Sequence, residues 1–311
     1  MYTRFLWVIF YFYSALNNKV GVLGLGLMGS QLAMRLINAG YHISIYNRSN
    51  EKTKQFEKLD VHIARSPMAL AETCDFLLVC VTDFEAVKKI CFGANGIITA
   101  NRKDLVVADS STISPEQSRY NAETLRRNEI EMLGMPLMGG PTAARDGRLV
   151  SIVAGNKEAF ERTKQVIETV ASSIFYIGDI DGSANALKLA LNLNIALIAS
   201  AISEGITLVR GSGIDPRIFI KILNSTYFKT GLSEIKGPKM VNNNFEPSFH
   251  LKNMLKDLEL AISTAQDTGV SIPLAGLAQQ IYQAANNSGF SDYDYTAIVG
   301  FMQKINGLLL K

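Results

Sequence analysis

"KVGVLGLGLMGSQLAMRLINAG", residues 19–40, carries the strongest local indication of the fold of this chain. Its glycines have the spacing G-x-G-x-x-G, which on its own also occurs in turns that bind no ligand. They are Gly24, Gly26 and Gly29. A short apolar run typical of a buried strand precedes them, and apolar residues at helical spacing follow them as far as Gly40. This order predicts a loop that holds the pyrophosphate of a dinucleotide at a helix N-terminus.

The rest of the first half alternates between strand patterns and helix patterns. Apolar or alternating runs predict strands at 42–46, 76–81, 105–109, 130–133, 149–154 and 174–177. Helical patterns separate them at 51–58, 84–90, 115–127 and 157–169. Because this alternation is typical of βαβ units, we expect residues 19–180 to form an α/β Rossmann domain with a doubly wound sheet.

The second half contains helical patterns only. The first is unusually long, from residue 182 to residue 210 without a proline, and would extend on the order of 40 Å. Shorter patterns follow at 215–223, 249–268, 273–287 and 293–304. The sequence therefore predicts a long interdomain helix at 181–211 and an all-α C-terminal domain at 212–311.

Composition narrows the class of protein. The chain has 311 residues, 48% of them apolar and 19% charged, with a net charge of +3. This small charge, with Lys and Arg scattered along the chain, argues against a nucleic-acid-binding protein. The three cysteines have no paired spacing, which favours free thiols in a reducing compartment over disulfides or a metal site. We expect a cytoplasmic protein that binds neither metal, nucleic acid nor membrane.

Residues 1–18, "MYTRFLWVIFYFYSALNN", do not suit this plan. Their apolar run superficially resembles a signal peptide, but it is shorter than the about 20 residues of a membrane span. It also continues directly into the predicted first strand. We expect an extraneous segment from a misassigned translation start, with the true product beginning near Leu16 or Asn17.

The end of the second predicted strand distinguishes between dinucleotides. NAD-binding sites normally place an acid there to accept a hydrogen bond from the ribose, whereas this chain has "YNRSN" at 46–50. Arg48 offers a planar cation that suits a 2′-phosphate, and Ser49 an adjacent hydroxyl. The pattern favours NADP(H). The alternative is an exposed Arg48 that contacts no ligand.

A lysine interrupts the apolar pattern of the long helix. Asn185, Lys188 and Asn192 form one polar stripe within "GSANALKLALN", residues 182–192. An ammonium at this place could stabilise the charge that develops on a carbonyl oxygen during reduction and deliver a proton to it. The residues alone leave a second interpretation equally open, a lysine whose charge reaches solvent from a partly exposed helix.

Four segments beyond the glycine loop give the chain a family resemblance. They are "DSSTISP" (109–115), "GMPLMGGPTAARDGRLVSIVAG" (134–155), "GSANALKLALN" (182–192) and "LKDLELA" (255–261). With them, residues 19 to about 306 resemble the β-hydroxyacid dehydrogenases, which include 3-hydroxyisobutyrate dehydrogenase, tartronate semialdehyde reductase and the glyoxylate/succinic semialdehyde reductases. "NRS" at 47–49 looks like the NADP-dependent glyoxylate/succinic semialdehyde reductase branch.

The resemblance implies an NADP(H)-dependent oxidoreductase. It would transfer a hydride between the nicotinamide and a small carboxylate substrate such as glyoxylate, succinic semialdehyde, 3-hydroxyisobutyrate or tartronate semialdehyde. Lys188 would be the catalytic residue and Asn192 its partner. Both would contact the substrate together with Ser111, Met138, Gly139 and Gly140. The expected cofactor contacts are Gly24, Leu25, Gly26, Leu27, Met28, Gly29, Asn47, Arg48, Ser49, Val81, Thr82, Thr112 and Lys256. The family also implies a homodimer or homotetramer.

Several positions depart from the family pattern. Met138 stands where a hydroxyl normally assists the substrate carboxylate, which leaves the substrate open and permits a more apolar one. Asp181 and Ala184 stand where glycines are common, which would affect the shape of a loop. Two alternatives to a hydroxyacid dehydrogenase are an imine reductase-like enzyme, which shares this architecture but typically lacks the lysine, and a non-catalytic NADP-binding scaffold.

Overall fold

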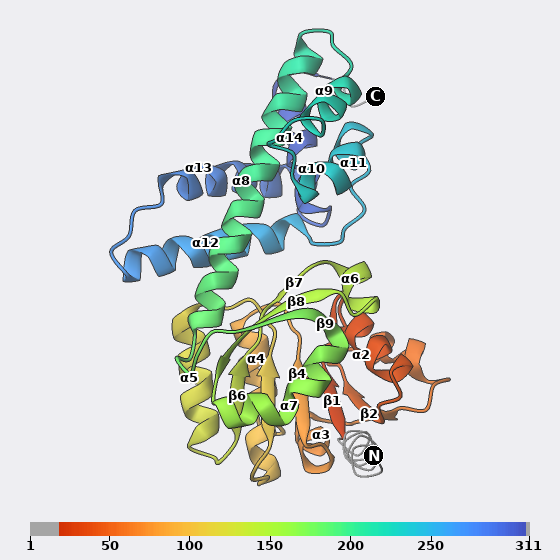
Figure 1. Ribbon diagram of the computed structural model, residues 1–311, viewed down its shortest axis with the longest axis vertical. Helices are drawn as coiled ribbons and strands as arrows, with labels where there is room; N and C mark the ends of the chain where they lie inside the picture. Colours follow the sequence, from red (N-terminus) through yellow and green to blue (C-terminus); the bar gives the residue numbers. More distant parts are fainter. Residues whose placement is uncertain (1–18, 309–311) are drawn as a thin grey trace, which may run out of the picture. The chain divides into compact units, whose positions relative to one another are not determined.

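The computed structural model describes residues 19–308 (Figure 1). The expected extraneous segment at 1–18 lies outside the described residues. The chain divides into two compact units, Met1–Lys188 and Leu189–Lys311. We call them the sheet unit and the helical unit. Their boundary falls within one long helix, α8 (Ser183–Gly211), so the first turns of this helix belong to the sheet unit.

The sheet unit is built on nine strands in the order β3-β2-β1-β4-β5-β6-β8-β7, with β9 paired to β8. All pairs from β3 to β6 are parallel, whereas β8 is antiparallel to both β6 and β7. The strands are β1 (Val20–Leu23), β2 (Ile43–Tyr46), β3 (His62–Ile63), β4 (Phe76–Val79), β5 (Val106–Asp109), β6 (Glu131–Gly134), β7 (Leu137–Met138), β8 (Leu149–Gly155) and β9 (Ala171–Tyr176). The order in which the chain adds strands to the sheet changes sides between β1 and β4, and open α/β sheets bind ligands beyond the carboxyl ends of the strands at such a point.

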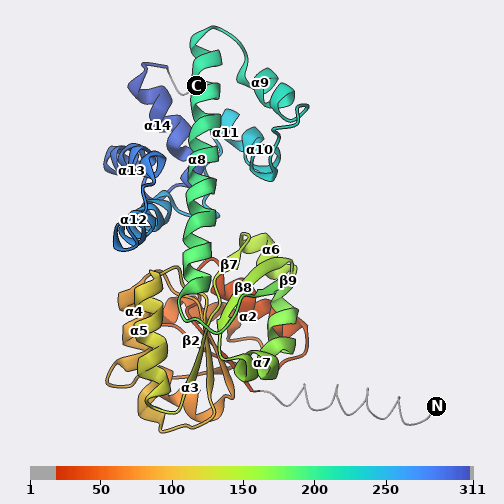
Figure 2. The ribbon, with the colours of Figure 1, turned by 60° about the vertical axis from the view of Figure 1, so that its left-hand side comes forward.

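Helices cover both faces of this sheet, with α4 and α5 on one side and α2 and α7 on the other (Figure 2). The alternation of β1 explains the two layers, since Val20 and Val22 enter the core beneath α2 and α7 and Leu23 enters the core on the opposite face. The helices are α2 (Gly29–Asn38), α3 (Pro67–Thr73), α4 (Phe84–Phe92), α5 (Pro115–Arg126), α6 (Pro141–Arg145) and α7 (Lys157–Val170), with 3-10 turns at Asn50–Phe56 and Ile97–Ala100.

In the helical unit, shorter helices pack against the later turns of α8. Ala196 and Ala199 of α8 share a core with α12 and α13, while Ile202 and Ile206 share another with α9 and α11. Figure 2 shows these two groups on opposite sides of α8. The helices are α9 (Pro216–Leu223), α10 (Gly231–Ile235), α11 (Gly237–Val241), α12 (Leu251–Asp267), α13 (Pro273–Ala285) and α14 (Ile298–Ile305), with a π-helical turn at Asn286–Phe290 and a 3-10 turn at Tyr295–Ala297.

The predicted fold class is confirmed. The α/β unit, the long helix and the helical unit all follow the sequence patterns, although the expected helix at 51–58 is a 3-10 turn at Asn50–Phe56. Short elements were not predicted, among them β3, α3, β7, α6, α10 and α11. Within the described part of the chain, only α8 is long and apolar enough by length and composition to cross a membrane. Core helices pass the same criterion, so this is weak evidence for a span.

Candidate active site

The glycine loop joins β1 to α2, and its glycines have different functions. Gly24 has a φ of +94°, and a Cβ atom there would lie 2.3 Å from the carbonyl oxygen of Cys80. A Cβ atom at Gly29 would lie 1.8 Å from the carbonyl oxygen of Gly24. A Cβ atom at Gly26 would meet nothing within 4 Å. The fold itself therefore requires the first and third glycines, while the second keeps an open surface that a ligand can approach.

Asn47, at the end of β2, fixes the shape of this loop. Its Oδ1 accepts a hydrogen bond from the amide of Leu25 at 2.9 Å, and its Nδ2 donates to the carbonyl of Ser49 at 2.9 Å. Met28, at the N-cap of α2, provides no side-chain acceptor for the first amides of the helix. Those amides carry the positive end of the helix dipole, so the open side of the loop suits a pyrophosphate. The residues present fit the dinucleotide that the motif implies.

A basic residue follows each of two neighbouring strands, β2 and β3. Arg48 follows β2 and is exposed. In the parallel pairing of β2 with β3, Ile45 lies opposite Ile63, and the amide of Ala64 donates to the carbonyl of Ile45 at 2.9 Å. The exposed Arg65 follows β3 directly after Ala64, as the exposed Arg48 follows β2 after Asn47, so the two arginines come at the ends of paired strands. Arg65 was not predicted as a site residue, and the pairing of β3 with β2 is the signal that identifies it.

The ends of β4 and β5 are braced by Ser111. Its Oγ accepts a hydrogen bond from the amide of Val81 at 3.1 Å, and its own amide donates to Oδ1 of Asp109 at 2.9 Å. Ser111 is only 1% exposed, so its hydroxyl positions the strand ends. Thr82 and Thr112, two expected cofactor contacts, lie in the segments that follow these strands.

Asp109 is a buried acid at this edge. Burial is the main cause that raises its pKa from 3.8 to about 6, against hydrogen bonds from Ser111 that lower it. The folded protein therefore holds this proton more tightly than the unfolded chain does. The stabilisation from the protonated form is complete below about pH 3.8 and is lost as the pH rises through about 6.

We predict that Asp109→Asn reduces this pH dependence. The free energy of unfolding of the variant, relative to wild type, should increase by about 1–2 kcal/mol between about pH 5 and about pH 8. Urea unfolding at a series of pH values measures the difference, with the exposed Asp60→Asn as a control that leaves the slope unchanged. A constant difference between Asp109→Asn and wild type across this range would contradict the prediction.

Lys188 lies at the carboxyl edge of the same sheet. Its Nζ donates to the carbonyl oxygen of Leu137 at 2.6 Å and lies 3.2 Å from the Sδ of Met138, so the short edge strand β7 holds the half-buried ammonium. Cys80 is influenced both by Lys188 and by Gly29 of the glycine loop. Burial raises the pKa of Cys80 to about 11, while a hydrogen bond from the amide of Gly29 and the charge of Lys188 both lower it. The thiol is thus close to the N-terminus of α2 and within the field of the lysine.

Two glycines follow Met138. Gly139 has a φ of +120°, and a Cβ atom there would lie 2.7 Å from a methyl group of Leu149. Gly140 has open space where a Cβ atom would lie. Of the predicted substrate residues, Met138 thus ends the strand that holds Lys188, and Gly139 and Gly140 follow it directly.

The remaining predicted residues belong to the helical unit and share one carboxylate. Nδ2 of Asn192 donates to Oδ2 of Asp257 at 2.6 Å, and Nζ of Lys256 lies 2.8 Å from Oδ1 of Asp257. Asp257 is 1% exposed. Asp257 was not among the predicted site residues. The signal was present in the sequence, because Asp257 lies in the buried stripe of α12 between Met254 and Ala261, where a charge must be paired.

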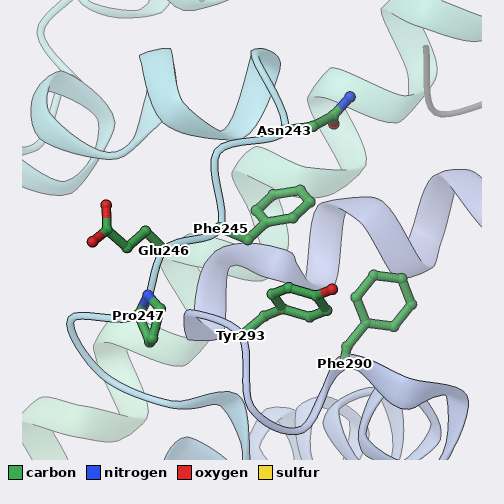
Figure 3. Close-up of a pocket in the computed structure, with 6 residues that line it drawn as sticks. All are labelled: Asn243, Phe245, Glu246, Pro247, Phe290 and Tyr293. Atoms are coloured by element: carbon green, nitrogen blue, oxygen red, sulfur yellow. The ribbon is translucent and has the colours of Figure 1, made fainter.

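A separate hollow of about 380 Å³ opens in the helical unit (Figure 3). It is lined by Asn243, Phe245, Glu246, Pro247, Phe290 and Tyr293. The rings lie along it, whereas the carboxylate of Glu246 points away from them (Figure 3). None of the predicted site residues lines this hollow. Across residues 19–308, no group of three or more His, Cys, Asp or Glu side chains is arranged to hold a metal ion.

Two family matches cover most of the chain and change from one to the other just before α8. Residues 19–178 match the family described as the NAD binding domain of 6-phosphogluconate dehydrogenase. Residues 182–302 match the family described as NAD-binding of NADP-dependent 3-hydroxyisobutyrate dehydrogenase.

Individual relatives agree with the family matches. Glyoxylate/succinic semialdehyde reductase 2 of Arabidopsis thaliana is 29% identical over 90% of this chain and 78% of its own length. The cytokine-like nuclear factor N-PAC of Xenopus tropicalis is 30% identical over 91% of this chain, which spans about half of that protein.

A solved structure extends the likeness to the fold. The crystal structure of 3-hydroxyisobutyrate dehydrogenase from Salmonella typhimurium superposes with a TM-score of 0.85 at 25% identity, over 92% of this chain and all of that one. The chain belongs to the 3-hydroxyisobutyrate dehydrogenase-like β-hydroxyacid dehydrogenase family, the NAD(P)-dependent oxidoreductases whose dinucleotide domain resembles that of 6-phosphogluconate dehydrogenase.

Proposed function

We propose that this protein is an NADP(H)-dependent reductase of small carbonyl acids, with Lys188 as the proton donor. Its substrates would be of the glyoxylate, succinic semialdehyde or tartronate semialdehyde class, and 3-hydroxyisobutyrate in the oxidative direction. The observation that carries the proposal is the ammonium of Lys188, which the carbonyl of Leu137 holds at 2.6 Å at the edge of the sheet that also bears the open glycine loop.

The chemistry follows from this ammonium. A bound nicotinamide would supply the hydride in reduction or receive it in oxidation. As a carbonyl carbon accepts a hydride, its oxygen becomes negative, and the ammonium of Lys188 stabilises that charge and gives up a proton. In the oxidative direction the neutral amine takes the hydroxyl proton. The hydrogen bond to Leu137 orients Nζ throughout. In the helical unit, Asp257 orients the amide of Asn192 through Oδ2.

The preference for NADP(H) rests on charge at the ends of β2 and β3. A 2′-phosphate would meet Arg48, the hydroxyl of Ser49 and Arg65, and the strand end carries no acid that would accept from a ribose hydroxyl. Glu51, the nearest acid in the chain, lies 2.7 Å from the ammonium of Lys54, which offsets its charge.

We predict that Arg48→Ala and Arg65→Ala each weaken NADP⁺ binding about tenfold or more while leaving the dissociation constant of NAD⁺ within about twofold. Each guanidinium supplies charge-assisted hydrogen bonds only to the extra phosphate, worth about 1.5–3 kcal/mol. Fluorescence titration with both dinucleotides measures the effect. The exposed Arg119→Ala on α5 is the matched control. Equal losses for NAD⁺ and NADP⁺ would contradict the assignment of either arginine.

A screen of NADPH oxidation tests the proposed activity. Glyoxylate, succinic semialdehyde, methylmalonate semialdehyde and tartronate semialdehyde are the substrates to compare, each with NADPH and NADH. We expect turnover with at least one of them and a preference for NADPH. A cyclic imine in the same assay tests the imine reductase alternative, against which the lysine argues. NADPH binding without turnover of any carbonyl or imine would support a scaffold.

We also propose that the protein forms a homodimer or homotetramer through its helical unit. A hollow of about 530 Å³ lies between α8, α13 and α14 and is mostly apolar. Leu208 at its edge is 72% exposed, and Leu277 on α13 is 62% exposed. Apolar surfaces of this kind usually mark an interface, and the family resemblance favours a second copy as the partner. Sedimentation velocity measures the assembly, and a wild-type monomer would contradict it.

A further inference from the structure

The thioether of Met138 is the side chain that meets the ammonium of Lys188. Its Sδ lies 3.2 Å from Nζ. Met138 is half-buried, and it packs against a small apolar cluster of Ile152, Ala154 and Ala184. Met138 ends β7, and the two residues between it and the start of α6 are glycines, which have no side chain.

The chemistry of a thioether limits what can bind at this place. Its sulfur has no proton to donate and accepts hydrogen bonds only weakly, and its methyl and methylene groups are apolar. A carboxylate needs hydrogen-bond donors or cations when it leaves water. A carboxylate bonded directly to the reacting carbonyl carbon would have to lie beside Met138, which offers it no donor, while the ammonium of Lys188 serves the carbonyl oxygen. An uncharged substituent would pack against the thioether without such a loss.

We propose that Met138 is a specificity-determining residue that directs the site towards carbonyl compounds with an uncharged group next to the carbonyl carbon. Semialdehydes, whose carboxylate is separated from the aldehyde by methylene groups, meet this condition, and 2-oxo acids such as glyoxylate do not. The inference rests on the proposed function of Lys188 and narrows its substrate class. It predicts that the wild-type protein prefers succinic semialdehyde to glyoxylate in kcat/KM.

Two substitutions distinguish the effect of the missing hydrogen-bond donor on specificity from the effect of the side chain's shape. Met138→Gln has about the same length and adds an amide donor, whereas Met138→Leu keeps an apolar side chain of similar volume. We expect Met138→Gln to raise the ratio of kcat/KM for glyoxylate over succinic semialdehyde by about ten- to a hundredfold, because one hydrogen bond to a charged group is restored. Met138→Leu should leave the ratio within about threefold. If Met138→Gln does not fold, Met138→Ser provides a smaller donor for the same comparison.

A binding measurement tests the inference without turnover. Oxamate carries a carboxylate directly on an amide carbonyl and resembles a 2-oxo acid. We expect its dissociation constant with the NADPH complex, followed by NADPH fluorescence, to fall about tenfold or more in Met138→Gln and to stay unchanged in Met138→Leu.

The outcomes distinguish this inference from the proposed function. An unchanged ratio and unchanged oxamate binding in Met138→Gln would overturn the assignment of Met138. So would an equal effect of Met138→Leu, or a wild-type preference for glyoxylate over succinic semialdehyde. If the wild-type protein turned over none of the carbonyl acids in the screen while Met138→Gln bound oxamate more tightly, the proposed reductase function would fail, whereas the binding preference assigned to Met138 would stand.

Discussion

Lys188→Ala is expected to lower kcat for carbonyl reduction by about 10²–10⁴-fold. The range is that of a lost general acid, since water must then protonate the developing alkoxide. The hydrogen bond that the carbonyl of Leu137 receives from Nζ would also disappear, and Leu137 lies outside the glycine loop. The dissociation constant of NADPH should therefore stay within about threefold of the wild-type value. Steady-state kinetics and fluorescence titration measure the two quantities.

Two controls make the Lys188 result specific. Primary amines added to Lys188→Ala should restore part of the rate, because a small ammonium ion can enter the space left by the side chain. Lys188→Arg keeps a positive charge but is a poor proton donor near neutral pH, so its rate should stay low. If Lys188→Ala kept most of the wild-type kcat, the assignment of Lys188 as the proton donor would be wrong.

Gly26→Ala is expected to weaken NADPH binding by about tenfold or more without lowering the melting temperature. The added methyl group meets no protein atom within 4 Å, so folding is not affected. It would occupy the open side of the loop, where the backbone must approach the pyrophosphate, and steric overlap of this kind costs about 1–3 kcal/mol.

Gly29→Ala is the contrasting variant. Its Cβ atom would lie 1.8 Å from the carbonyl oxygen of Gly24, so the loop and the start of α2 must shift. We expect a clear loss of thermal stability, measured by circular dichroism, together with weaker binding. Wild-type affinity in Gly26→Ala would show that this loop does not hold the cofactor.

Most of the fold could be predicted because its elements have strong local patterns. The apolar runs of β1, β4 and β5 and the uninterrupted pattern of α8 depend only on neighbouring residues. The missed elements are short. The strands β3 and β7 have two residues each, and their strand character comes from pairing with β2 and β8, which lie elsewhere in the sequence. Patterns of single segments do not contain such pairings.

The candidate site divides in the same way. The glycine loop, Arg48 and Lys188 lie in contiguous motifs, so the sequence could indicate them. In the sheet unit, Arg65 is identified by the pairing of β3 with β2. In the helical unit, Asp257 is identified by its contacts with Lys256 and with Asn192, 65 positions earlier in the chain. One departure from the family pattern is also explained by a contact. Asp181, which stands where glycine is common, lies 3.0 Å from the guanidinium of Arg126.

The positions of the cysteines allow local opening of the protein to be measured by thiol labelling. Cys74, Cys80 and Cys91 all belong to the sheet unit, and burial raises the pKa of each thiol. Because Cys74 and Cys91 are buried, a thiol reagent under native conditions can reach them only when this unit opens, whereas Cys80 is half-buried. The labelling rate would measure how often the sheet unit opens locally. The helical unit has no cysteine and would give no signal. A saturating dinucleotide should slow the labelling of Cys80, beneath the glycine loop.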